Sequence, residues 1–174
     1  PTVQQVDRYI ALTKDGRLLQ LDPNTGEGAE TDFLKTFAAA AGEIVSISAS
    51  GYSTPIHKYC GICAVNINGE VWCASTSSSS SESPQKMQLP SPIEKVSIGI
   101  NTCMINNAGE AWCYGCDLLN YTEEGPCRVV ISIPTTVTGL TDLVDISTGG
   151  RQSCAVKTSG EVVCWGQHGP GLGV

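Results

Sequence analysis

The chain has 174 residues and a formal net charge of −7, with 10 Lys and Arg residues against 17 Asp and Glu residues. The basic residues are scattered, which argues against a nucleic-acid-binding surface and against binding to anionic membranes. The densest apolar run, at 37–41, is much too short to span a membrane, so we expect no membrane insertion. The 9 cysteines favour an oxidising compartment, which predicts a secreted or cell-surface protein.

Four predicted hairpins follow one another along the chain, each preceded by a short apolar strand. The hairpins span 10–20, 63–73, 103–113 and 154–164, and the preceding strands span 3–6, 44–47, 96–98 and 143–146. Each hairpin has a glycine at the same place, where a three-residue loop requires a positive φ; these are Gly16, Gly69, Gly109 and Gly160. The units begin about 40 to 53 residues apart, a period typical of β-propeller blades. We therefore expect one domain built from units at 1–42, 43–92, 93–141 and 142–174.

Cysteines stand at both ends of the last three hairpins, ten positions apart. If Asn66 pairs with Glu70, the antiparallel register places Cys63 directly opposite Cys73. Directly opposed residues have Cα atoms about 4.5 to 5.5 Å apart, a separation that suits a disulfide. The spacing predicts three cross-strand disulfides, namely Cys63–Cys73, Cys103–Cys113 and Cys154–Cys164. The first hairpin has Ile10 and Gln20 in the corresponding places.

The last unit carries a more specific pattern. It contains Ser153-Cys-Ala-Val156, Gly160-Glu-Val-Val-Cys-Trp-Gly166 and Gly171-Leu-Gly173. This resembles a regulator of chromosome condensation (RCC1-like) repeat, and the cysteine-bearing form is similar to secreted members of that family. The resemblance implies an all-β fold, a β-propeller of about seven four-stranded blades that serves mainly as a recognition scaffold. Some members exchange guanine nucleotides on a small nuclear GTPase, an activity of a reducing compartment that the cysteines of this chain argue against.

The fourth unit ends soon after its hairpin, and no outer strand follows it. The chain is therefore expected to hold about three and a half blades of a partial propeller. An open arc exposes the faces of its terminal blades and a strand edge, and such edges pair with other chains. Two completions stay open. Further residues of a longer polypeptide complete the ring, or a neighbouring subunit does so, including in a head-to-tail filament.

Three cysteines remain after these pairings: Cys60, Cys116 and Cys127. We favour a Cys116–Cys127 disulfide, which leaves Cys60 for an intermolecular bridge or as a free thiol. The alternative pairs Cys60 with Cys116 and leaves Cys127 unpaired. A redox role for Cys60 and Cys63 is disfavoured because no helix follows them. A four-cysteine zinc site is disfavoured because the hairpin disulfides remove the thiolates it requires.

The remaining candidate residues indicate no catalytic, cofactor or metal site. Asn120 begins a glycosylation sequon, and the Ser-rich run at 75–83 reads as a surface loop open to O-glycosylation. His57 and His168 fall in predicted loops and are expected to be loop residues rather than catalytic bases. Trp72, Trp112 and Trp165 occupy blade positions expected in the core, with stacking on a sugar as the functional alternative.

These observations predict a non-enzymatic, secreted propeller module with a structural or adhesive role. It is expected to assemble through its incomplete blade ends into an oligomer or an extracellular filament. The expected partners are copies of itself or another protein subunit, with glycans as further ligands and no nucleic acid. The alternative is a soluble binding module, such as a lectin or a protein inhibitor, that uses the loops of one propeller rim. An intracellular exchange factor or ubiquitin-related scaffold is the third hypothesis.

Overall fold

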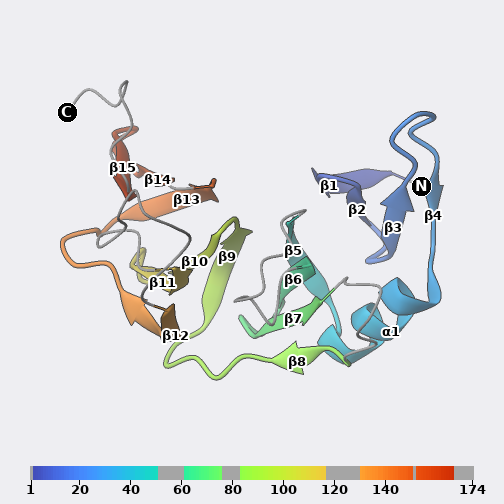
Figure 1. The fold of residues 1–174 in the computed structure, drawn as a ribbon, viewed down its shortest axis with the longest axis horizontal. Coiled ribbons are helices and arrows are strands. Elements are labelled where there is room, and N and C mark those ends of the chain that lie inside the picture. Colours follow the sequence, from blue (N-terminus) through green and yellow to red (C-terminus); the bar gives the residue numbers. More distant parts are fainter. Residues whose placement is uncertain (1, 51–60, 76–82, 117–129, 151, 167–174) are drawn as a thin grey trace.

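The structure is a computed structural model that describes residues 2–50, 61–75, 83–116, 130–150 and 152–166. It is nearly all-β, with four antiparallel sheets that follow one another in chain order. Figure 1 shows the sheets arranged in an open arc, with β1 at one end and β15 at the other. The all-β propeller fold that the sequence predicts is confirmed.

Each sheet is a blade, numbered here from the N-terminus. Blade 1 contains β1 (Val3–Asp7), β2 (Ile10–Thr13), β3 (Leu18–Leu21) and β4 (Gly28–Ala29). Blade 2 contains β5 (Ile44–Ala49), β6 (Gly61–Asn66), β7 (Val71–Ser75) and β8 (Gln85–Lys86). Blade 3 contains β9 (Ile93–Ile98), β10 (Asn101–Asn106), β11 (Ala111–Cys116) and β12 (Val130–Thr136). Blade 4 contains β13 (Leu143–Thr148), β14 (Gln152–Lys157) and β15 (Val162–Gly166).

The two central strands of each blade form the predicted hairpin. Cys63 pairs with Cys73, Cys103 with Cys113, and Cys154 with Cys164. In blade 2 the turn is closed by backbone hydrogen bonds from Asn66 N to Glu70 O at 3.0 Å and from Gly69 N to Asn66 O at 2.9 Å. Gly69 has a φ of 73°, as a loop of this kind requires.

One helix, α1 (Asp32–Ala41), lies between blades 1 and 2 and was not among the predicted elements. The side chain of Thr31 caps its first turn by accepting a hydrogen bond from Leu34 N at 3.2 Å, and Gly42 ends it at a φ of 80°. Leu34, Phe37 and Ala41 are buried and join the apolar residues that the two blades contribute. The helix thus fills the space between the first two blades.

The core consists of three apolar clusters, one between each pair of successive blades. Because side chains alternate along a strand, each blade has a near face, toward the preceding blade, and a far face, toward the following one. The far face of blade 2 packs on the near face of blade 3; the residues are Cys63, Val65, Val71 and Cys73 against Ile93, Val96, Ile98, Met104 and Tyr114. The far face of blade 3 packs on the near face of blade 4; the residues are Cys103, Ile105, Ala111 and Cys113 against Leu143, Ile146 and Ala155.

In the part of the chain that the structure describes, no helix has the length and apolar character that crossing a membrane requires.

Candidate functional site

The first strands of the four blades line the concave side of the arc. They are β1, β5, β9 and β13, and Figure 1 shows them on the inner side of the successive blades. A cavity of about 690 Å³ lies against them. Its polar lining includes Gln5, Asp7, Ser48, Ser97 and Asp145.

A ladder of hydrogen bonds connects these inner strands from blade to blade. Asp7, Ser48 and Ser97 hold the same register position in blades 1, 2 and 3, since each lies opposite the first residue of its hairpin pair. Each one accepts a backbone N–H from the next blade. The bonds run from Ala49 N to Asp7 Oδ2 at 3.0 Å, from Ile98 N to Ser48 Oγ at 3.0 Å, and from Thr148 N to Ser97 Oγ at 2.9 Å. This side-chain position therefore fixes the stacking of one blade on the next.

Two further contacts reinforce the inner strands. The Gln5 amide donates to Ile47 O at 2.8 Å and accepts from Ile47 N at 2.9 Å. Lys95 Nζ forms an ion pair with Asp145 Oδ1 at 2.9 Å, between blades 3 and 4. The polar groups of the concave surface are thus largely used to connect blades.

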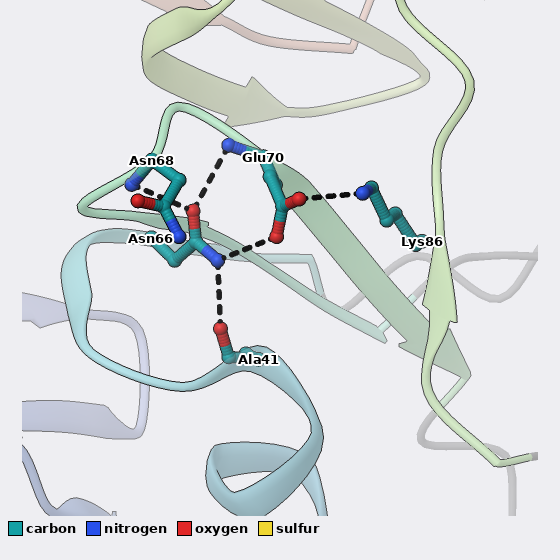
Figure 2. Close-up of polar contacts among 5 residues, drawn as sticks. All are labelled: Ala41, Asn66, Asn68, Glu70 and Lys86. Carbon is teal, nitrogen blue, oxygen red and sulfur yellow. Dashed lines mark hydrogen bonds and ion pairs between the residues drawn. The ribbon is translucent and has the colours of Figure 1, made fainter.

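Asn66 organises the hairpin turn of blade 2, as Figure 2 shows. Its Oδ1 accepts hydrogen bonds from Asn68 N and Glu70 N, both at 3.0 Å. Its Nδ2 donates to Ala41 O and to Glu70 Oε2, both at 2.9 Å. The hydrogen bond from Lys86, followed by that from Asn66, lowers the pKa of Glu70 below its ordinary value of 4.5. Glu70, which follows the turn glycine Gly69, therefore has a structural role in this hairpin.

Blade 3 repeats this arrangement, whereas blades 1 and 4 replace it. Asn106 Oδ1 accepts from Glu110 N at 2.9 Å, and Asn106 Nδ2 donates to Glu110 Oε2 at 2.7 Å. In blade 4 the corresponding residue is Lys157, which pairs with Glu161 at 2.7 Å. In blade 1 it is Thr13, whose hydroxyl accepts from Arg17 N at 3.0 Å.

The three hairpin disulfides are Cys63–Cys73, Cys103–Cys113 and Cys154–Cys164, the pairs that the ten-residue spacing predicts. Their Cα–Cα separations are 4.1, 4.1 and 4.0 Å. All three lie on the far faces of their blades. The first two are buried between blades, whereas Cys164 of the third is exposed.

The far face of blade 4 is open, although it matches far faces that are covered elsewhere. It consists of Cys154, Val156, Val162 and Cys164, and we call these four residues the terminal far face. Val162 is 62% exposed, whereas the corresponding Val71 and Ala111 in blades 2 and 3 are both 0% exposed. The terminal far face is the apolar surface that a following blade would cover.

The near face of blade 1 is open in the same way. Val3, Val6 and Tyr9 project from it and are 44%, 54% and 53% exposed. We call these three residues the initial near face. The residues in the places of Val3 and Val6 in blade 2 are Ile44 and Ile47, which are 4% and 1% exposed.

Several predicted site residues fall outside the described part of the chain. These are Cys60, Cys127, Asn120, His57 and His168. Cys116 ends β11, where its backbone pairs with Val130, and its side chain is not described. The pairing of Cys60, Cys116 and Cys127 and the glycosylation of Asn120 therefore stay predictions.

The three tryptophans are partly buried and pack against the clusters between blades. Trp72 packs between blades 1 and 2, Trp112 between blades 2 and 3, and Trp165 between blades 3 and 4. These positions are those of core residues, and they disfavour a shared stacking platform for sugars.

Comparisons with known proteins identify the fold. No protein-family model matches the chain, and no curated protein matches it in sequence. Human WBSCR16 is similar in structure, with a TM-score of 0.61, 15% identity, and coverage of 94% of this chain and 47% of that protein. Prp20p of Saccharomyces cerevisiae, the yeast RCC1, has a TM-score of 0.55, 14% identity, and coverage of 94% and 47%.

A third similar structure is the CRINKLY WD40 ectodomain of the Arabidopsis thaliana receptor kinase ACR4. It has a TM-score of 0.51 and 20% identity, with coverage of 90% of this chain and 46% of that domain. The chain thus spans about half the length of the structures it resembles. Its fold is that of an RCC1-like β-propeller, represented by four consecutive blades.

Proposed function

We propose that the chain is a non-enzymatic, extracellular protein-interaction module with a structural or adhesive role, and that it assembles through its open blade ends. The observation that carries this proposal is the terminal far face. It leaves Val162 exposed at a position whose equivalents are completely buried inside the arc. Apolar surface of this kind favours association, because burial removes it from water.

The disulfides support the extracellular part of the proposal. Three cross-strand bridges lie within about a hundred residues, and such bridges persist mainly in oxidising compartments. The similar structure from ACR4 is itself an ectodomain. Glycosylation at Asn120 and an intermolecular bridge through Cys60 belong to the same proposal.

Two features support an interaction module rather than an enzyme. The side chains of Asp7, Ser48 and Ser97 already bind backbone N–H groups of neighbouring blades, so they are committed to stacking. Among the similar structures, the yeast RCC1 has been solved bound to Kap60, and Prp20p is described with binding properties to Gsp1p and histones. Those partners are proteins, and we propose a protein partner for this chain as well.

The test is the mass of the purified chain in solution, measured by sedimentation with and without reductant. We expect a species larger than the 18.2 kDa of one chain under non-reducing conditions. A strictly monomeric, monodisperse species under both conditions contradicts assembly. A thiol count on the native protein is the second measurement, and finding all nine thiols free contradicts the extracellular assignment.

A further inference from the structure

We infer that the terminal far face binds the initial near face of a second copy of this chain, so that two copies close one ring. This inference rests on the proposed function and specifies its partner and its contact surfaces. The second copy would place Val3, Val6 and Tyr9 against Val156, Val162 and the Cys154–Cys164 disulfide.

The covered interfaces within the chain are the template for this contact. At the junction of blades 2 and 3, the disulfide Cys63–Cys73 and its neighbour Val71 pack on the first strand of the next blade, through Ile93 and Val96. At the junction of blades 3 and 4, the disulfide Cys103–Cys113 and Ala111 pack in the same way on Leu143 and Ile146. The terminal far face repeats this pattern with Cys154–Cys164 and Val162.

The initial near face carries the complementary half of the pattern. The register with β2 places Val3 and Val6 where blade 2 has Ile44 and Ile47. The same two positions hold Ile93 and Val96 in blade 3 and Leu143 and Ile146 in blade 4. Every one of these later residues is buried at 9% or less, whereas Val3 and Val6 are exposed. Blade 1 therefore presents the apolar residues that the far face of a preceding blade covers elsewhere.

The hydrogen-bond ladder points the same way. Ser147 holds the register position of Asp7, Ser48 and Ser97, since it lies opposite Cys154. Those three side chains each accept an N–H from the following blade. Ser147 is exposed and has no such bond within the described residues. In the proposed contact its hydroxyl would accept a backbone N–H from the inner strand of the second copy.

The shape of the arc favours a second copy as the occupant. Four blades occupy the arc, and its two ends face across an opening in Figure 1. Two such arcs contribute eight blades, which lies within the range of about four to eight that propellers use. A heterologous contact made twice around a two-fold axis closes on itself, so both open faces of both copies become covered.

The test uses one substitution on each face and a matched control. Val162→Glu alters the terminal far face and Val6→Glu alters the initial near face. Ile67→Glu is the control, because Ile67 is 61% exposed, like Val162, but lies in the hairpin turn of blade 2. All three positions are exposed in the single chain, so the fold should tolerate each change.

The measurement is the mass in solution as a function of protein concentration. We expect the unaltered chain and Ile67→Glu to reach about 36 kDa, twice the 18.2 kDa of one chain. Val162→Glu and Val6→Glu should each weaken association at least tenfold, because a carboxylate would be buried in an apolar contact. In an equimolar mixture, blade 4 of the Val6→Glu chain and blade 1 of the Val162→Glu chain are both unaltered. The two variants should therefore associate through this one junction more tightly than either variant associates with itself, but less tightly than the unaltered chain.

The outcomes separate this inference from the proposed function. If the unaltered chain is always a monomer, the proposed assembly fails. If it associates but neither Val162→Glu nor Val6→Glu weakens association, assembly stands and the blade 4 to blade 1 contact is wrong. If Val162→Glu abolishes association and Val6→Glu leaves it unchanged, the contact between blade 4 and blade 1 is also wrong, because blade 4 would then bind another surface. Masses that grow beyond two chains with concentration indicate a filament and overturn the closed ring.

Discussion

Replacing Ser48 by Ala should destabilise the chain through the junction of blades 2 and 3. The Ser48 hydroxyl donates to Asp7 Oδ2 at 2.8 Å and accepts from Ile98 N at 3.0 Å, so it connects three successive blades. Ser48 is 3% exposed and Ile98 is 6% exposed. Alanine fits the site but supplies neither hydrogen bond.

The expected cost follows from these two bonds. Leaving the Ile98 N–H buried without an acceptor costs about 1–3 kcal/mol, and losing a hydrogen bond to a carboxylate costs about 1.5–3 kcal/mol. Asp7 keeps its bond from Ala49 N, which limits the second loss. We therefore expect the free energy of unfolding to fall by about 2–4 kcal/mol. Ser147→Ala is the matched control, since Ser147 has the same register position and is exposed, and it should change stability by less than about 0.5 kcal/mol.

The assay is equilibrium unfolding in urea at concentrations where the chain is monomeric. Tryptophan fluorescence is a suitable signal, because Trp72, Trp112 and Trp165 all pack between blades. A Ser48→Ala cost below about 0.5 kcal/mol would refute the structural role of the ladder. An equal cost for Ser48→Ala and Ser147→Ala would refute the idea that the ladder ends at an open blade.

Three further substitutions test the hairpin turns. Asn66→Ala should lower the free energy of unfolding in urea by about 2–3 kcal/mol, because it removes a buried amide that makes four hydrogen bonds. Asn68→Ala is the control and should cost less than about 0.5 kcal/mol, because the Asn68 side chain is exposed and has no such network. Equal costs would contradict this. Gly69→Ala should cost about 2–4 kcal/mol in urea unfolding, because the new Cβ would lie 2.5 Å from Pro92 Cβ in a backbone with a φ of 73°. Gly160→Ala is the control and should cost about 1–2 kcal/mol, because Gly160 has a φ of 85° but open space around it. A larger cost for Gly160→Ala than for Gly69→Ala would contradict the stacking of the blade 2 turn on blade 3. The lowered pKa of Glu70 means that its charged form stabilises the fold above its ordinary pKa of 4.5, and that this contribution is lost as the pH falls through the folded-state pKa. Acid unfolding curves of Glu70→Gln should therefore lose part of the dependence on pH below 4.5, and a curve that keeps all of it would exclude this group as a contributor.

The hairpins of blades 2, 3 and 4 were predictable because two independent signals agree within each of these repeats. The glycine specifies the position of the turn, and the ten-residue spacing of the cysteines specifies the register, so the pairing of Cys103 with Cys113 needed no tertiary information. The inner strands were also predictable, although β9 begins at Ile93 rather than at Val96. The boundaries of a strand depend on where its partner strand ends, and they are harder to predict from sequence than the apolar centre of the strand.

The helix α1 was missed although its signals are present. Thr31 is a good N-cap, Gly42 is a good C-terminal residue, and Leu34, Phe37 and Ala41 have helical spacing. These residues lie between two strand-rich units, where a linker was expected. The outer strands β4 and β8 have only two residues each, so no alternation of apolar and polar residues could reveal them.

The ladder of the inner strands was only half visible in sequence. A Ser follows Ile47, Val96 and Ile146, and Asp7 follows Val6, which marks one repeated position. Which atom each side chain binds depends on the stacking of blades, and a single repeat does not contain that information. The same holds for the open faces, because Val162 and Val71 look alike in sequence and differ only in whether another blade covers them.

The central claim is that successive blades, three of them bridged by a disulfide, stack in an arc in which the far face of blade 4 is exposed. The most direct measurement is limited reduction of the native protein, at concentrations where its mass is 18.2 kDa, followed by alkylation and peptide mass analysis. The account predicts the pairs 63/73, 103/113 and 154/164, with Cys154–Cys164 reduced first, because Cys164 is exposed and the other two bridges are buried between blades. Different pairs, or reduction of all three bridges at the same rate, would contradict it.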